Sequence, residues 1–140
     1  MFKRILLVIL IVSLSSCGKE TYVAEEAYDY WENGNIGEDV EIINGQFWKS
    51  DHWSYEYVVF LELRPSEKWM EKFFEIYRAE ENELGKFNSE NKTHLTNGPN
   101  WFANPQWFNP TSDFIVYQGY GGNYYWNEEE NILMFYEMQL

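Results

Sequence analysis

The segment from Asn100 to Pro110 carries the most unusual combination of side chains in the chain. In this segment a Trp-Phe pair recurs after six residues, each time followed by an Asn-Pro pair. Proline holds the residue before it in an extended conformation, which would make the segment stiff. Flat aromatic rings stack on sugar rings or apolar ligand groups, and asparagine amides supply donors and acceptors beside them. The pattern therefore suggests a platform for a glycan or peptide, built from Trp101, Phe102, Trp107 and Phe108.

The same aromatic side chains also fit a second arrangement, which the sequence leaves open. They can fold back over a sheet as a lid and give the long loop a small core of its own. A further aromatic group surrounds the Gly-Tyr-Gly-Gly turn at 119–122, where Tyr120 and Tyr124 are candidates for ligand binding. This turn lacks the lysine and the spacing of a phosphate-binding loop, so we expect a hairpin.

The sequence contains no set of residues spaced like a catalytic or metal site. Neither of its two histidines, His52 and His94, belongs to an H-x-x-x-H or H-E-x-x-H pattern. Asp51 precedes His52, but neighbouring residues on a strand point to opposite faces, so this carboxylate would orient the imidazole poorly. We therefore expect no catalytic residue, metal ion or cofactor, and an enzyme is the less favoured interpretation.

The single cysteine, Cys17, follows a segment typical of a secretory signal peptide. Lys3 and Arg4 form a short basic start, an unbroken apolar run covers 5–12, and a mostly small, serine-rich stretch covers 13–16. The apolar run is shorter than the about 20 residues that a membrane-spanning helix requires. A lone cysteine also excludes an intramolecular disulfide and a multi-cysteine metal site.

The residues Leu14, Ser15, Ser16 and Cys17 resemble the lipobox of bacterial lipoproteins. In that class a leucine stands three residues before the cysteine, and small residues fill the two positions between them. The resemblance implies that Cys17 receives diacylglycerol on its sulfur and becomes the N-terminus after cleavage. Two or three acyl chains, such as palmitate, would then anchor the protein firmly. Because Gly18 rather than aspartate follows the cysteine, the outer membrane is favoured in a Gram-negative cell, on its periplasmic face or at the cell surface.

The charge balance restricts the partners of the protein. The chain has 10 basic and 23 acidic side chains and a formal charge of −13. Binding to nucleic acid or to anionic lipid requires an excess of Lys and Arg, so the composition argues against both. Loss of Lys3 and Arg4 with the signal peptide would leave the mature chain more negative still. Such a charge attracts cationic proteins, although it also serves solubility.

The hydrophobic pattern predicts an α+β fold, an antiparallel sheet of about five to six strands with two helices packed on it. Helices are expected from about Thr21 to Glu32 and from Glu67 to about Asn82, the second capped by Ser66. A type I′ turn at Asn44-Gly45 would join two of the strands. The strands are expected at 38–43, 46–49, 53–63, 113–118, 123–126 and 132–139. A long aromatic loop at 86–111 separates the second helix from the last three strands.

The sequence thus predicts a signal peptide at 1–16, a lipidated N-terminus and tether at 17–21, and one globular domain at 22–140. The leading functional interpretation is a membrane-anchored, non-catalytic accessory domain of the cell envelope that binds a protein or a glycan. A sharper version is an immunity- or inhibitor-type lipoprotein that neutralises a basic toxin or hydrolase. A cell-envelope hydrolase is the third alternative, supported only by His52 and scattered acids.

Overall fold

The computed structural model describes residues 18–33, 37, 39–51, 56–78, 82–88, 104–119 and 121–139. The elements in these ranges confirm the predicted α+β class. None of their helices is both long and apolar enough to cross a bilayer. In chain order they are β1 (Lys19–Thr21), α2 (Ala24–Glu32), β2 (Val40–Lys49), β3 (Tyr57–Pro65), α3 (Glu67–Tyr77), β4 (Glu83–Lys86), β5 (Ile115–Gln118), β6 (Gly122–Asn127) and β7 (Ile132–Gln139).

The strands form one sheet of seven in the order β1-β2-β3-β7-β6-β5-β4. All neighbouring pairs are antiparallel. The central strands β3 and β7 pair from Tyr57↔Gln139 to Leu63↔Leu133, far apart in sequence. The short strands β1 and β4 form the two edges, and they raise the count slightly above the predicted five to six.

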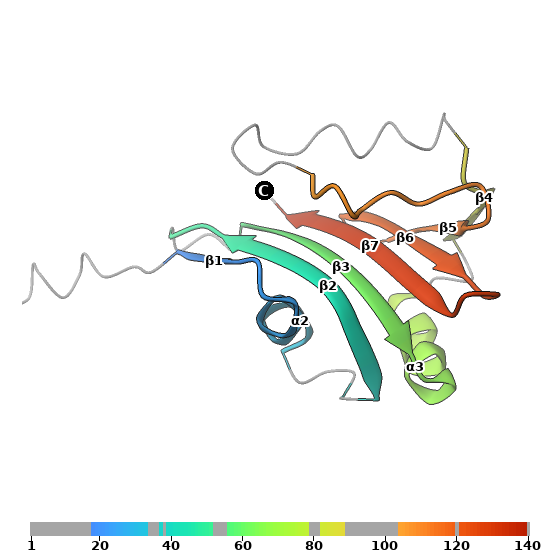
Figure 1. The fold of residues 1–140 in the computed structure, drawn as a ribbon, viewed down its shortest axis with the longest axis horizontal. Coiled ribbons are helices and arrows are strands. Elements are labelled where there is room, and N and C mark those ends of the chain that lie inside the picture. The colour runs from blue at the N-terminus through green and yellow to red at the C-terminus, as the bar shows by residue number, and fades with distance from the viewer. Residues whose placement is uncertain are drawn as a thin grey trace, which may run out of the picture.

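The sheet is covered on both faces. Figure 1 shows α2 and α3 on one face, and the irregular segment that precedes β5 over the other. Along β3, Val59 and Leu61 point into the helix-side core, while Val58 and Phe60 point into the second core. This alternation confirms the part of the predicted strand 53–63 that the structure describes. Because both faces are buried, β3 is apolar on both sides.

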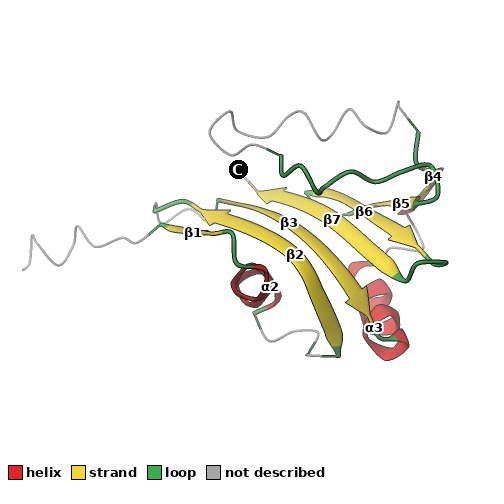
Figure 2. Cartoon of the chain, viewed as in Figure 1, coloured by secondary structure: helices red, strands yellow, loops and turns green. Residues whose placement is uncertain are grey.

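Local signals explain where the two helices begin and end (Figure 2). The Ser66 side chain accepts a hydrogen bond from the Trp69 backbone N–H at 3.2 Å, which confirms it as the N-cap of α3. Asn33 ends α2 in a left-handed conformation, as expected of an asparagine at that position. The Trp69 indole donates to the Tyr28 hydroxyl at 2.9 Å and so connects α3 to α2.

The predicted Asn44-Gly45 hairpin is wrong, because β2 runs through this dipeptide without turning. The register of the β2–β3 pair shifts between Ile42 and Asn44, which marks a β-bulge. A Cβ on Gly45 would lie 2.9 Å from the Ala24 backbone. The glycine therefore lets α2 pack closely against the strand, rather than supplying a turn.

The second helix is shorter than expected. It ends at Tyr77, and Arg78 caps it in a left-handed conformation. Residues 83–86, interpreted from the sequence as the helix end and the loop after it, form edge strand β4. At the other edge, β1 takes up residues 19–21, which were expected in the tether.

Candidate functional site

A groove of about 1100 Å³ lies between α3 and the turn that joins β6 to β7. Its apolar side chains come from Met70 and Phe74 on the helix and from Trp126 on β6. Both Phe74 and Trp126 are partly buried against the helix-side core. We call this cavity the α3 groove.

Acidic side chains line the α3 groove around these apolar groups. Glu67, Glu71 and Glu75 lie four residues apart on α3, and such spacing places side chains on one face of a helix. Glu128 adds a fourth carboxylate from the β6–β7 turn, and Arg78 lies at the C-terminal end of the helix. The groove therefore combines an apolar surface with an excess of negative charge.

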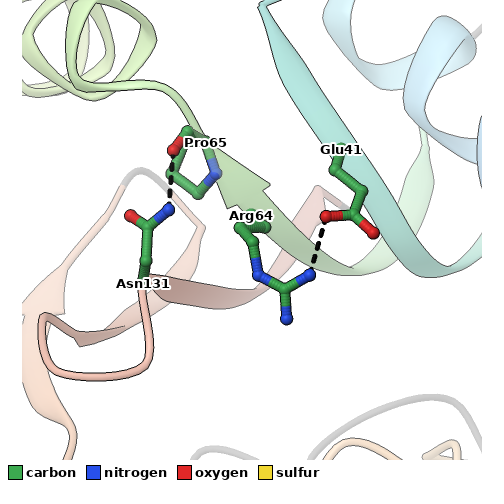
Figure 3. A network of polar contacts seen from close by, with 4 residues as sticks. All are labelled: Glu41, Arg64, Pro65 and Asn131. Carbon is green, nitrogen blue, oxygen red and sulfur yellow. Dashed lines mark hydrogen bonds and ion pairs between the residues drawn. The ribbon is translucent and has the colours of Figure 1, made fainter.

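Hydrogen bonds fix the turn that forms one wall of the groove. The Asn131 side chain donates to the Pro65 carbonyl oxygen at 3.0 Å, from the turn to the end of β3 (Figure 3). Asn127 Oδ1 accepts from the Glu130 backbone N–H at 3.1 Å, inside the turn itself. Asn131 also has a φ of 53°, a conformation that asparagine tolerates better than most residues. The wall of the groove is thus held in place before any partner binds.

Beyond the groove, Figure 3 shows an ion pair that joins two strands. The Arg64 guanidinium lies 2.7 Å from the Glu41 carboxylate, and both side chains are exposed. Exposed pairs contribute about 0–1 kcal/mol, so this one contributes little to stability.

A second cavity, of about 330 Å³, lies between α2 and the β1–β2 edge of the sheet. We call it the β1–α2 cleft. Its polar side chains include Lys19, Lys49 and Asp29, and the aromatic rings of Tyr30 and Tyr57 also line it. Lys19 and Lys49 are direct partners across the β1–β2 pair. The Lys19 ammonium lies 4.3 Å from the centre of the Tyr30 ring, a cation–π contact.

Behind this cleft, the buried carboxylate of Glu137 connects three elements. Its Oε2 accepts from the Trp31 indole of α2 at 3.2 Å, and its Oε1 accepts from the Tyr57 hydroxyl of β3. Burial raises the pKa of the Glu137 carboxyl, although hydrogen bonds from Tyr57, Trp31 and Tyr124 oppose the rise. Burial and the nearby Glu137 also raise the pKa of the Tyr57 and Tyr77 hydroxyls.

A carboxyl with a raised pKa is a common sign of a catalytic acid or base. Glu137 is only 6% exposed, however, and both of its oxygens are already hydrogen-bonded. The geometry therefore supports a structural role, in which Glu137 holds α2 against the centre of the sheet. Within the described residues, no three His, Cys, Asp or Glu side chains come together as a metal site.

The structure places three of the predicted ligand-binding aromatics. Trp107 is half-buried, and Phe108 is buried with its ring 5.1 Å from Phe60 and 5.8 Å from Tyr125. Tyr124 is fully buried on the opposite face of the sheet. The rings of Phe108 and Tyr124 thus have no surface open to a ligand, and Phe108 adopts the lid arrangement. Seven predicted site residues lie outside the described ranges: Leu14, Ser15, Ser16, Cys17, Trp101, Phe102 and Tyr120.

Comparison with known proteins does not identify a relative. No family model matches the chain. No curated protein and no solved structure matches it either.

Neither the groove nor the buried carboxylate was predicted from the sequence. The four-residue spacing of Glu67, Glu71 and Glu75 is visible in the sequence, but the opposing wall comes from a turn more than fifty residues later. Glu137 shares the helix-facing side of β7 with Leu133 and Phe135. A lone acid on an otherwise apolar strand face is the signal that could have revealed it.

Proposed function

We propose that the protein is a lipid-anchored lipoprotein of the bacterial cell envelope, and that its folded domain binds a basic segment of a partner protein in the α3 groove. The α3 groove is the observation that carries the binding function. Its apolar surface at Phe74 and Trp126 would contact the aliphatic or aromatic side chains of the partner, and its glutamates would pair with lysine or arginine. The lipobox-like Leu14-Ser15-Ser16-Cys17 supports the anchor.

Two further observations favour a cationic protein as the partner. The chain has a formal charge of −13, which speeds the encounter with a cationic protein over long distances. The hydrogen bond from Asn131 to Pro65 fixes the groove wall in advance, so less ordering is needed when the partner binds. These properties suit an immunity- or inhibitor-type lipoprotein that neutralises a basic toxin or hydrolase.

Metabolic labelling with palmitate in the producing bacterium tests the anchor. We expect label on the wild-type chain and none on the Cys17→Ser variant. A chain without label, or label that persists in the variant, would overturn the proposed lipid attachment.

Fluorescence anisotropy with labelled peptides tests the binding function. One peptide combines lysine and arginine with tryptophan, a second has the same charges without tryptophan, and a third replaces the basic residues by glutamate. We expect the first to bind most tightly and the third not to bind, with affinity for the basic peptides falling steeply as salt is added. Equal binding of the acidic peptide, or no binding of either basic peptide at low salt, would contradict the proposal.

A further inference from the structure

We propose that the β1–α2 cleft binds the headgroup of a zwitterionic phospholipid and thereby orients the domain on the membrane. This inference rests on the proposed lipid anchor at Cys17. It adds a second site, with a ligand and a position different from those of the α3 groove.

The short distance from the anchor to the sheet is the first argument. Strand β1 begins at Lys19, so only Gly18 separates Cys17 from the folded sheet. Consecutive Cα atoms are about 3.8 Å apart, so the Cα atom of Lys19 cannot lie more than about 8 Å from that of Cys17. A lysine so close to the acyl chains must lie in the headgroup layer of the bilayer.

The fold then brings the rest of the cleft to the same layer. The Lys19 ammonium packs on Tyr30 of α2, and Lys19 is the cross-strand partner of Lys49. Residues distant in the sequence therefore approach the membrane together with the anchor. Tyrosine is enriched at this depth, because its ring is apolar and its hydroxyl is polar.

The side chains of the cleft match both charges of a zwitterionic headgroup. The two ammonium groups of Lys19 and Lys49 line the same cavity, and both can approach one phosphate placed between them. Asp29 lines the cavity as well and can pair with the headgroup amine. The rings of Tyr30 and Tyr57 can pack against that cation.

The surface around the cleft favours a zwitterionic over an anionic lipid. Glu20 and Asp51 line a neighbouring cavity together with both lysines, so the corner as a whole carries no excess of positive charge. Tyr22 and Val23 add exposed apolar surface directly after β1, at 66% and 51% exposure. Contact with the lipid interface would cover this surface.

The position of the cleft leaves the α3 groove accessible. Strand β1 lies at one edge of the sheet and β4 at the other. Helix α3 packs toward the far half of the sheet, with Phe74 against Tyr117 of β5 at a ring distance of 5.3 Å. A domain held on the membrane at its β1 edge therefore presents the groove away from the bilayer.

Two single-cysteine reporters test this orientation in the lipidated full-length protein. Glu25→Cys lies one turn before Asp29 on the exposed side of α2, and Leu84→Cys lies on edge strand β4. Each is labelled with a fluorophore and placed in vesicles of phosphatidylethanolamine and phosphatidylcholine that contain a nitroxide-headgroup lipid. We expect quenching at the Glu25 position and little at the Leu84 position.

Charge variants then test the cleft itself. Replacing both lysines, by Lys19→Gln with Lys49→Gln, should reduce the quenching at the Glu25 reporter to the value at the Leu84 reporter. Lys68, an exposed lysine of α3, serves as the control, because Lys68→Gln should leave the quenching unchanged.

The possible failures are distinguishable. A chain that takes up no palmitate through Cys17 would overturn the proposed anchor, and the inference with it. A lipidated chain with equal quenching at both reporters would overturn the orientation alone. Quenching at the Glu25 reporter that survives the double lysine variant would overturn the headgroup site.

Discussion

The regions around α2 and α3 cover the same face of one sheet, yet they present different chemistry to the outside. The cleft beside α2 contains a cross-strand pair of lysines, Lys19 and Lys49. The groove beside α3 contains four glutamates around an apolar surface. A single total charge of −13 conceals this separation. We therefore propose that each helix borders a site for a different class of partner.

The two helices are also attached in different ways. Helix α2 packs closely on β2 across Gly45 and is held by the hydrogen bond from Trp31 to Glu137. Helix α3 is attached by aromatic contacts, above all through Phe73, whose ring meets that of Tyr124 on β6 edge to face at 4.9 Å. Substitutions that damage one attachment should therefore affect its own site most.

The largest effect is expected from Phe73→Ala, which removes a fully buried ring beneath α3. Such truncations cost about 3–5 kcal/mol of unfolding free energy. Urea unfolding followed by tryptophan fluorescence measures the loss, and basic-peptide binding should weaken in parallel. A loss comparable to that of an exposed substitution such as Ile76→Ala would contradict this account of α3.

The matching test on α2 is Gly45→Ala. The added methyl group would lie 2.9 Å from backbone atoms of Ala24, so the helix must shift. Overpacking of this kind costs about 1–3 kcal/mol. We expect weaker headgroup-dependent quenching at the α2 reporter and unchanged peptide binding in the α3 groove. If peptide binding fell as far as reporter quenching, the two regions would not be independent.

A smaller effect is expected at the groove wall, from Asn131→Ala. The variant loses the hydrogen bond to Pro65 and places alanine at a φ of 53°, for a cost of about 1–2 kcal/mol. Asn131→Gly is the matched control, because glycine accepts the positive φ but also lacks the hydrogen bond. Equal peptide affinity in the wild type and both variants would show that the wall does not need this contact.

The smallest effect concerns pH and the polar contact that holds α2. Burial raises the folded-state pKa of Glu137 above the ordinary 4.5, so the native carboxyl holds a proton more tightly than the unfolded one does. The resulting contribution of Glu137 to the free energy of unfolding is fully present below the unfolded-state pKa. It is lost as pH rises through the folded-state pKa. The wild type should therefore lose stability relative to Glu137→Gln as pH rises above the ordinary carboxyl pKa of 4.5. Urea unfolding at several pH values measures the difference, and a difference independent of pH would contradict the raised pKa.

The parts of the fold that follow from local pattern were predictable from the sequence. Strands β5, β6 and β7 lie within a few residues of the predicted ranges, because alternation and the intervening turns determine them locally. Ser66 was identified as a helix cap for the same reason. The α+β class followed from the order of these elements.

The parts that depend on distant contacts were not predictable. Asn44-Gly45 has the composition of a hairpin turn, but the approach of α2 uses the glycine for close packing instead. The edge strand β4 exists because Gly85 and Lys86 find partners in β5, about thirty residues later. The α3 groove likewise requires Trp126 and Glu128 to meet a helix from the middle of the chain.

The most direct test of the proposed binding function compares two variants with the same change in charge. One carries Glu67→Gln, Glu71→Gln and Glu75→Gln in the α3 groove, and the other carries Glu25→Gln, Glu41→Gln and Glu83→Gln on exposed residues outside it. Anisotropy with the basic, tryptophan-containing peptide measures both affinities across a salt series. We predict a loss of about tenfold or more, with a shallower salt dependence, for the groove variant and little change for the other. Equal losses in the two variants would show that total charge, and not the groove, attracts the peptide.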